Sequence, residues 1–397
     1  MPDNFLTLAQ QIAAKQEAVV GTAETLTNAN VKLKPFQSAI QFTPDLPRFA
    51  NDEVADDIGV ASDFVGGLAG KLGFGCAFHG AGVLATEPSI GIYLEACGNK
   101  KQFVQQITIG SITGGDNIFA AGEIYSAASG TKTGIIEATI SGAGSMRYII
   151  TTGSALVAAD VVTSGGDSAT TSGSTTTYAW KYSPLSYAHK TLTIQRGTKN
   201  SAGTAAADYL FRLAGALGTG KIEASALDAL RFQSEFSGKL NFAGNGTLLS
   251  GQTYESLTTA LQPKLVSATM QVNGVAVRPS QFSLDFGVDV QMDPDPTTTG
   301  TNGYDFARIV RREPKITLDP YRTPTTVLDD LNLLTTGVTF PFQLILGTTP
   351  NLIEINASKC QLIGWGEQDR IGRHVGAFEL AVTRSTLLDD DWNIYFR

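Results

Sequence analysis

A glycine-rich segment that ends in lysine is the first part of the chain whose residue types suggest chemistry. Residues Gly215–Lys221 read GALGTGK. A phosphate-binding loop needs glycine amides around the phosphates, a lysine on the outer phosphates, and then a hydroxyl that reaches Mg²⁺. Ile222 occupies the hydroxyl position, and no apolar strand ending in aspartate follows at the spacing of a βαβ unit. We therefore expect a glycine-rich turn between strands.

A thiol and an imidazole lie three residues apart at Cys76 and His79. Cysteine catalysis requires the two groups to be close in space, with a third group orienting the histidine. On a strand, residues three apart point to opposite faces, so this pair is predicted to be structural. His189 and His374 are isolated, and no Cys/His/Asp spacing matches a zinc or calcium site. The sequence predicts no catalytic residue, metal or cofactor, and we expect that the chain is not an enzyme.

Charged residues form several short clusters. The run Asp389–Asp391 could line a channel or hold a cation, but a solvated turn is the favoured interpretation. Six other acidic residues could likewise either line a channel or lie in a solvated loop: Asp52, Glu53, Asp56, Asp57, Asp293 and Asp295. Another cluster has balanced charge and indicates pairing between subunits instead of a nucleic-acid patch: Arg308, Arg311, Arg312 and Glu313.

The overall composition narrows the class of protein. The chain has 397 residues, of which 42% are hydrophobic and only 17% are charged, with 42 glycines. This composition is typical of many short strands joined by turns, with large surfaces buried between copies. The formal net charge is −8, so the chain cannot neutralise phosphates and grip nucleic acid. An acidic surface would still allow DNA to slide past.

The spacing of the cysteines and the hydropathy of the sequence indicate the cellular compartment in which the protein folds. The three cysteines, Cys76, Cys97 and Cys360, have no paired spacing, which indicates folding in a reducing cytoplasm. Residues 1–16 lack the basic and apolar regions of a secretory signal. No run of 18 apolar residues is present, so we expect no membrane-spanning segment.

Alternation of apolar and small or polar residues predicts strands along most of the chain. The period of two is clearest at Leu72–Phe78 and Phe282–Phe286. The dipeptide Asn273-Gly274 lies between alternating apolar residues, and it predicts a tight hairpin because both central positions need positive φ.

Two segments have the pattern of short helices. Pro88–Cys97 and Pro324–Leu334 each begin with a proline in the first turn, and Gly98 and Gly337 are the expected C-caps. One face of the second helix is expected to carry Val327, Leu328, Leu331 and Leu334. The predicted fold class is all-β with one short helix in each half.

The order of these elements suggests a domain organisation. Residues 1–30 form a leader, which could be a short helix or a strand. A first β-domain comprises 31–104 and 177–250, and a second comprises 251–397. The Gly/Ser/Thr-rich stretch 105–176 is interpreted as an inserted, outward-facing β-rich module, with a flexible linker as the alternative. The two halves share element order and length, which favours an internal duplication over two unrelated β-domains.

Through several short motifs and their order along the sequence, the chain resembles the long major tail tube proteins of bacteriophages and prophages with non-contractile tails. The resemblance covers nearly the whole chain apart from the insertion. It rests on Lys15–Thr22, which is similar to a KxExxxGT start, and on Leu72–Gly80, Leu94–Gly98, Gly220–Ala224, Phe232–Gly238, Arg312–Asp319, Asp369–Gly372, Phe378–Leu380 and Asp391–Phe396. The departures are Arg373-His374 and the large insertion.

The resemblance implies two β-sandwich or barrel tube domains that join neighbouring copies into rings. Stacked rings would form the tail tube of a virion that is assembled in the bacterial cytoplasm. The lumen would conduct DNA during ejection without binding it specifically, and the acidic residues named above are candidates for its wall. The implied partners are further copies of the chain and the tape-measure, tail terminator and tail-tip proteins. Two domains per chain favour trimeric, pseudo-hexameric rings, with a hexamer as the alternative.

Two other classes of function stay open at this point. A surface-exposed adhesin or glycan-binding β-protein would explain the Thr/Ser/Gly richness, but it should carry an export segment. A hydrolase needs a nucleophile, a base and an orienting group, and three scattered histidines provide few candidates.

Overall fold

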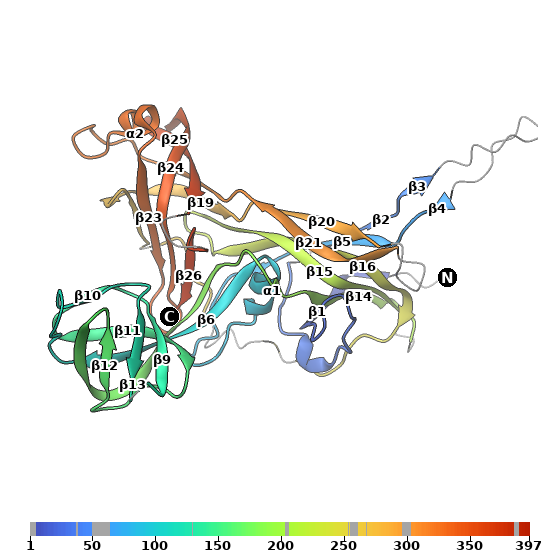
Figure 1. The fold of residues 1–397 in the computed structure, drawn as a ribbon. Helices are drawn as coiled ribbons and strands as arrows, with labels where there is room; N and C mark the ends of the chain where they lie inside the picture. The colour runs from blue at the N-terminus through green and yellow to red at the C-terminus, as the bar shows by residue number, and fades with distance from the viewer. Residues whose placement is uncertain are drawn as a thin grey trace, which may run out of the picture.

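The computed structural model describes most of the chain, and its fold is mostly β (Figure 1). The described residues are 5–36, 39–49, 64–128, 130–202, 206–252, 254, 261–266, 268–295, 303–384 and 389–397. Strands account for 59% of the structure and helices for 5%, which confirms the mostly-β prediction with two short α-helices.

One antiparallel sheet runs through both halves of the chain. Neighbouring strands pair in the order β2–β5–β16–β15–β19–β22–β25–β24–β23–β17. Their bounds are β2 Gln41–Asp45, β5 Ala69–Ala77, β16 Arg231–Gly246, β15 Asp208–Ser225, β19 Pro279–Asp285, β22 Lys315–Pro320, β25 Arg373–Thr383, β24 Ile353–Arg370, β23 Thr339–Leu346 and β17 Thr269–Val272.

Period-two alternation determines which face of this sheet is buried. Leu72, Phe74 and Cys76 on β5 are buried, as are Phe282 and Leu284 on β19. The residues between them point to the opposite face, as the alternation predicts. A single cluster of buried side chains extends from the first half to the second, so the halves share one core.

Further strands join this sheet. β14 (Leu192–Asn200) pairs with the first part of β15, before the stretch of β15 that pairs with β19. β1 (Phe5–Gln16) pairs with β14, so this part of the leader is a strand and not an α-helix. β18 (Val275–Ala276) pairs with β17 around the predicted turn. Asn273 and Gly274 have φ values of 51° and 74°, and the hairpin prediction is confirmed.

Both predicted helices are present but shorter than expected. α1 (Gly91–Ala96) lies within the first predicted range. α2 (Asp330–Thr336) begins six residues later than Pro324, because the Asp329 carboxylate accepts a hydrogen bond from the Asn332 amide and caps the helix there. Gly337, at φ 65°, confirms the predicted C-cap.

The predicted apolar face of the second helix is wrong in part. Leu328 is buried and Leu334 is partly buried against the core, whereas Val327 and Leu331 are exposed. Leu333, which is outside the predicted face, is buried. Only the last part of the predicted range is helical, so the helical spacing does not apply to residues before Asp329.

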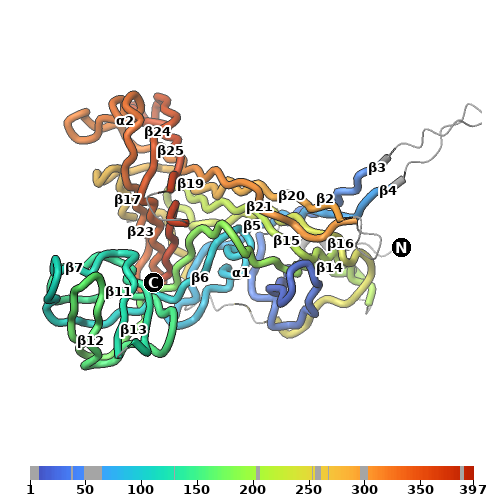
Figure 2. The backbone as a smooth tube through the Cα atoms, viewed as in Figure 1, coloured from blue at the N-terminus to red at the C-terminus, as the bar shows by residue number. Residues whose placement is uncertain are grey.

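The stretch 105–176 forms a β-rich lobe and not a flexible linker (Figure 2). Six antiparallel strands pair in a closed ring, β6–β11–β9–β8–β12–β13 and back to β6. Their bounds are β6 Asn99–Ile109, β8 Ile124–Ala127, β9 Lys132–Ile136, β11 Gly144–Thr152, β12 Val161–Ser164 and β13 Asp167–Pro184. A separate core fills the lobe, with Tyr125 and Tyr148 in edge-to-face contact.

The lobe is joined to the body by continuous strands and by a charged cluster. β6 and β13 extend beyond the lobe, and β13 pairs with β26 (Asn393–Phe396) of the body. The Tyr395 hydroxyl donates to Glu137 at 2.6 Å, and Lys181 lies 2.7 Å from the same carboxylate. These contacts fix the lobe to the last strand of the chain.

Three strand pairs lie outside these sheets. They are β3 (Arg48–Phe49) with β4 (Phe64–Val65), β7 (Ile118–Phe119) with β10 (Ile140–Ser141), and β20 (Val288–Pro294) with β21 (Tyr304–Arg312). A short 3₁₀ helix, η1, spans Asn28–Asn30. No helix within the described ranges is long and apolar enough to cross a membrane.

Candidate functional site

The glycine-rich segment lies within a strand and is not the predicted turn. Residues Gly215–Lys221 belong to β15, which pairs with β16 throughout this stretch apart from a β-bulge. Gly215 has φ 61°, and a Cβ there would lie 2.7 Å from Phe306, so close packing explains this glycine. The Lys221 ammonium lies 3.1 Å from Glu223. An extended backbone cannot wrap its amides around a phosphate, so this segment is not a phosphate-binding loop.

The thiols and imidazoles of the described chain do not form a nucleophilic site. All three cysteines are buried and unbridged. Burial raises the pKa of Cys97 above its ordinary range and that of Cys360 to about 12, so both are protonated thiols at neutral pH. His79 lies beyond the end of β5, where its Nδ1 is 2.8 Å from the Gly80 carbonyl. No group of three or more potential metal ligands occurs among the described residues.

The most extensive functional candidate is the exposed surface of the main sheet, which we call the polar face. It is built from the outward positions of β5, β16, β15, β19, β22 and β25. Buried residues alternate with these positions along every strand, so the sheet has an apolar and a polar side. The polar face comprises Lys71, Arg231, Gln233, Glu235, Lys221, Glu223, Ser225, Gln281, Ser283, Asp285, Lys315, Thr317 and Glu379.

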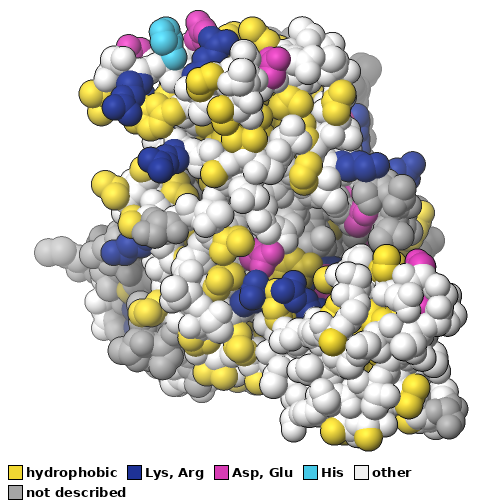
Figure 3. Space-filling model, turned by 90° about the vertical axis from the view of Figure 1, so that its left-hand side faces the viewer, with side chains coloured by type: hydrophobic (Ala, Val, Ile, Leu, Met, Phe, Trp, Pro, Cys, Tyr) yellow, Lys and Arg dark blue, Asp and Glu magenta, His cyan; other side chains and the backbone are white. Residues whose placement is uncertain are grey.

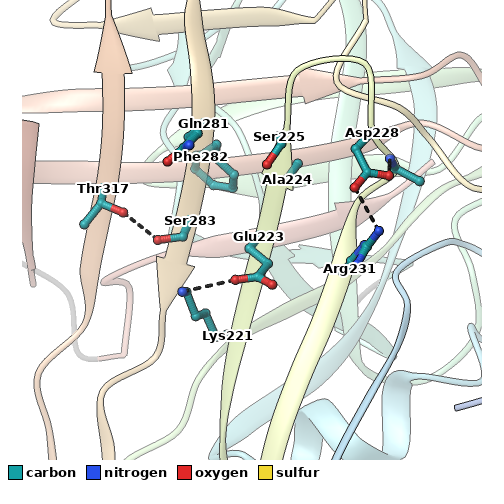
Figure 4. A pocket seen from close by; sticks show the side chains of 11 residues that line it. Lys221, Glu223, Ala224, Ser225, Asp228, Arg231, Gln281, Phe282, Ser283 and Thr317 are labelled. Atoms are coloured by element: carbon teal, nitrogen blue, oxygen red, sulfur yellow. Dashed lines mark hydrogen bonds and ion pairs between the residues drawn. The ribbon is translucent and has the colours of Figure 1, made fainter. Parts of the chain in front are cut away.

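Cross-strand registration places these side chains in rows. Lys221 is opposite Gln233 on one side and Asp285 on the other. In the adjacent row, Ser283 and Thr317 lie opposite each other, and their hydroxyls are 2.6 Å apart (Figure 4). The rows cross from β15 of the first half to β19 of the second half, so both halves contribute to one surface.

Every lysine and arginine of the polar face has a carboxylate partner. Lys221 pairs with Glu223, and Arg231 lies 2.9 Å from Asp228 (Figure 4). Two further pairs join adjacent strands, Lys71 with Glu235 at 3.4 Å and Lys315 with Glu379 at 2.8 Å. The hydrogen bond that Lys315 donates to the Glu379 carboxylate raises the pKa of Lys315, which keeps that ammonium charged. The face therefore combines high polarity with mutually neutralised charges.

Shallow hollows follow the polar face, and none is enclosed enough for a substrate site. One hollow of about 270 Å³ lies between β15 and β19, and another of about 530 Å³ lies between β5 and β15. The first is lined in part by the pairs Lys221–Glu223 and Arg231–Asp228, and the second by polar side chains of the face and by glycines of β5 and β15. Small-molecule sites bury most of their ligand and are largely apolar, which these hollows are not.

The acidic residues predicted from the sequence do not lie on the polar face where the structure describes them. Asp293 is on β20, and its carboxylate is 2.8 Å from Arg308 on β21. Asp295 follows β20, where its amide donates to the Gly303 carbonyl at 3.0 Å. The other four acidic candidates, Asp52, Glu53, Asp56 and Asp57, lie outside the described residues.

The arginine cluster makes contacts within the chain. Arg311 pairs with Glu313, and both are exposed. Arg312 is mostly buried and lies 2.8 Å from Asp391 and 3.8 Å from Asp389. The prediction of a solvated acidic turn at 389–391 is therefore wrong for Asp389 and Asp391, which are buried because a distant arginine neutralises them. A role between subunits stays a prediction for Arg308, Arg311, Arg312 and Glu313.

No known protein family and no curated protein matches this chain.

Proposed function

We propose that this chain is a structural protein of a long bacteriophage tail, which forms rings that stack into a tube around a DNA-conducting lumen. The observation that carries this proposal is the polar face, a broad charge-paired surface to which both halves of the chain contribute side by side. The order of the tail-tube-like motifs along the sequence supports it. In this proposal the polar face lines the lumen.

The chemistry of the polar face suits passage of a polyanion. DNA is retained by cations that neutralise its phosphates and release counterions. On this face each cation already has a carboxylate within 3.4 Å or less. Phosphates therefore gain little from contact with it, and surface hydroxyls and amides keep the wall hydrated. DNA can slide along such a wall without being held.

Ring formation needs sheet edges that can join neighbouring copies. β2 pairs only with β5 among the described strands, and Gln41, Thr43 and Pro44 on it are exposed. An open edge of this kind pairs with another chain unless it is protected. Because both halves share one sheet and one polar face, we further propose that they occupy equivalent places in the ring. Three chains would then fill the six domain positions of one ring, and each half of the duplicated chain would act as one tube domain.

The direct test is assembly of the purified chain. We expect rings or tubes in negative-stain electron micrographs of concentrated protein, and three chains per ring by native mass spectrometry. A strictly monomeric chain at all salt concentrations would contradict the proposed function. Six chains per ring would contradict the trimer and leave the tube intact. Discrete non-polymerising particles would favour the adhesin alternative.

Removing the carboxylate partners should make the polar face bind DNA. The triple substitution Glu223→Gln, Glu235→Gln and Glu379→Gln frees three lysines on one surface. We expect salt-dependent DNA binding by fluorescence anisotropy, with a slope of log K against log salt of roughly −2 to −3, whereas the unsubstituted chain does not bind. The matched control, Glu24→Gln with Asp116→Asn and Asp369→Asn, changes the net charge equally at positions outside the polar face. DNA binding that is equal in both variants would show that the face has no special role.

A further inference from the structure

A pocket of about 740 Å³, which we call the arginine pocket, lies at the end of the molecule that carries the β24–β25 turn. Its walls are residues 276–278 between β18 and β19, residues 321–324 after β22, and the beginning of β25. Figure 3 shows a histidine together with Lys and Arg side chains at this end of the molecule, at the top of the view. The arginine pocket shares no lining residue with the polar face, so it is a separate site.

Three arginines line the arginine pocket, and two of them have no acidic partner among the described residues. Arg322 pairs with Glu367 and lies 3.6 Å from Asp330, so its charge is compensated. Arg278 and Arg373 are exposed, and neither forms an ion pair with any described residue. The pocket therefore offers two guanidinium groups whose donors are available to an anion.

Strand pairing brings the two free arginines to the same place. In the β19–β22 pairing, Pro279 lies opposite Pro320, so the chain enters β19 beside the point where it leaves β22. Tyr321, the next residue, forms an antiparallel β-bridge with Val375 near the start of β25. One free arginine immediately precedes β19 and the other is the first residue of β25. The position of both guanidinium groups is thus set by rigid strands.

Stacking orders one of these guanidinium groups further. Tyr321 has Arg370 over its ring at 4.7 Å and Arg373 at 5.8 Å. Arg370 pairs with Asp319, which leaves Arg373 as the member of the stack with an uncompensated charge. A side chain that is already ordered loses less conformational entropy when it binds a ligand.

The rest of the lining determines which kind of anion fits. Ala276, Val277, Pro324 and the ring of Tyr321 form an apolar wall beside the arginines. The volume lies within the roughly 300–1,000 Å³ of typical small-molecule sites, which combine such walls with a few polar groups. Guanidinium groups bind phosphate and carboxylate oxygens through paired hydrogen bonds. A phosphate monoester carries close to two negative charges at neutral pH, which matches two uncompensated guanidinium groups.

We infer that the arginine pocket binds a phosphate monoester that carries an apolar or aromatic group. Arg278 and Arg373 donate charge-assisted hydrogen bonds to the phosphate oxygens, and the apolar wall contacts the organic group. Arg373-His374 is also where the sequence departs from the tail-tube-like motifs, so the site is a feature of this chain and not of those motifs. The inference goes beyond the proposed function and does not depend on it, because such binding requires neither rings nor DNA.

Phenyl phosphate is a suitable probe, and its binding to the full-length chain can be followed by ligand-observed phosphorus NMR at low salt. We expect binding that weakens as salt screens the charges, and roughly tenfold weaker binding to the double variant Arg278→Gln/Arg373→Gln. The matched control, Arg48→Gln/Arg384→Gln, removes two exposed arginines outside the pocket and should bind like the unsubstituted chain. No binding of phenyl phosphate, or equal loss in both double variants, would overturn the inference.

Two smaller probes test the two parts of the ligand separately. Inorganic phosphate lacks the apolar group and phenol lacks the charge, so each should bind roughly tenfold more weakly than phenyl phosphate. Inorganic phosphate or phenol that binds as tightly as phenyl phosphate would overturn the assigned ligand class.

The same phosphate chemistry occurs in soluble esters and in lipid headgroups, and vesicles distinguish these sources. Vesicles of phosphatidylcholine with phosphatidic acid present a phosphate monoester at a lipid surface, and vesicles of phosphatidylcholine alone do not. Flotation of the chain with the first kind only, lost in Arg278→Gln/Arg373→Gln, would support the inference with a lipid as the ligand. Binding of phenyl phosphate without flotation would support it with a soluble ester.

Discussion

Replacing Glu17 with alanine is expected to destabilise the folded chain by roughly 3 to 4 kcal/mol, because the carboxylate satisfies four donors in a buried position. Glu17 is 7% exposed. One carboxylate oxygen accepts from the Thr193 hydroxyl at 2.9 Å and from the Gly215 amide at 2.8 Å. The other accepts from the Gly21 amide at 2.8 Å and from the Thr191 hydroxyl at 2.7 Å. Alanine leaves all four donors without an acceptor.

This network connects the first strand to the centre of the body. The Gly21 amide that it holds belongs to a left-handed turn with φ 75°, and Gly215 lies on the bulge of β15. The hydrogen bond from the Gly21 amide to Glu17 therefore explains the spacing of these two residues in the Lys15–Thr22 motif. They fix the exit of β1 against β14 and β15.

Two control variants separate the hydrogen-bond network from a general loss of negative charge. Glu17→Gln keeps one acceptor oxygen but points its amide group at two donors. The stability of this variant should therefore lie between that of the unsubstituted chain and that of Glu17→Ala. Glu24→Gln removes a partly exposed carboxylate that pairs with Lys15 and should change stability little. Urea unfolding followed by fluorescence measures all three. Equal stability of Glu17→Ala and Glu24→Gln would show that the network does not stabilise the fold.

Replacing Trp392 with alanine is expected to cost about 3 to 5 kcal/mol of stability, the usual range for a large aromatic residue in a core. Trp392 is fully buried and stacks on Phe286 with ring centroids 5.2 Å apart. Arg312 lies over the same ring at 5.4 Å. The indole nitrogen donates to the Asn99 side chain at 3.1 Å, which connects the end of the chain to β6. Alanine creates a cavity where the two halves meet.

The partial substitution Trp392→Phe identifies which contact matters. Phenylalanine keeps most of the stacking on Phe286 and loses the hydrogen bond to Asn99, so we expect a loss of about 1 to 2 kcal/mol. Ile371→Ala is the exposed control and should change stability by less than about 0.5 kcal/mol. Thermal unfolding of the three variants provides the comparison. A Trp392→Ala variant as stable as Ile371→Ala would contradict the role of this residue in joining the halves.

Local patterns in the sequence predicted many of the strands and the presence of both short helices. Period-two alternation identified the strands and their buried side chains, because successive side chains on a strand point to opposite faces. Asn273-Gly274 predicted its hairpin, and Gly337 predicted the end of α2, because both depend only on the conformations that single residues adopt. Ile222, in place of a hydroxyl, correctly argued against a phosphate-binding loop.

The tertiary structure alone decided which distant groups meet. Alternation marks the face on which a side chain lies but does not identify the neighbouring strand, so neither the polar face nor the closed ring of the lobe could be read from the sequence. The donors to Glu17 lie up to 198 residues away, and Arg312 neutralises acidic residues that had been expected in a solvated turn. Burial of a charged group depends on its partners, and those partners are set by strand pairing over long separations.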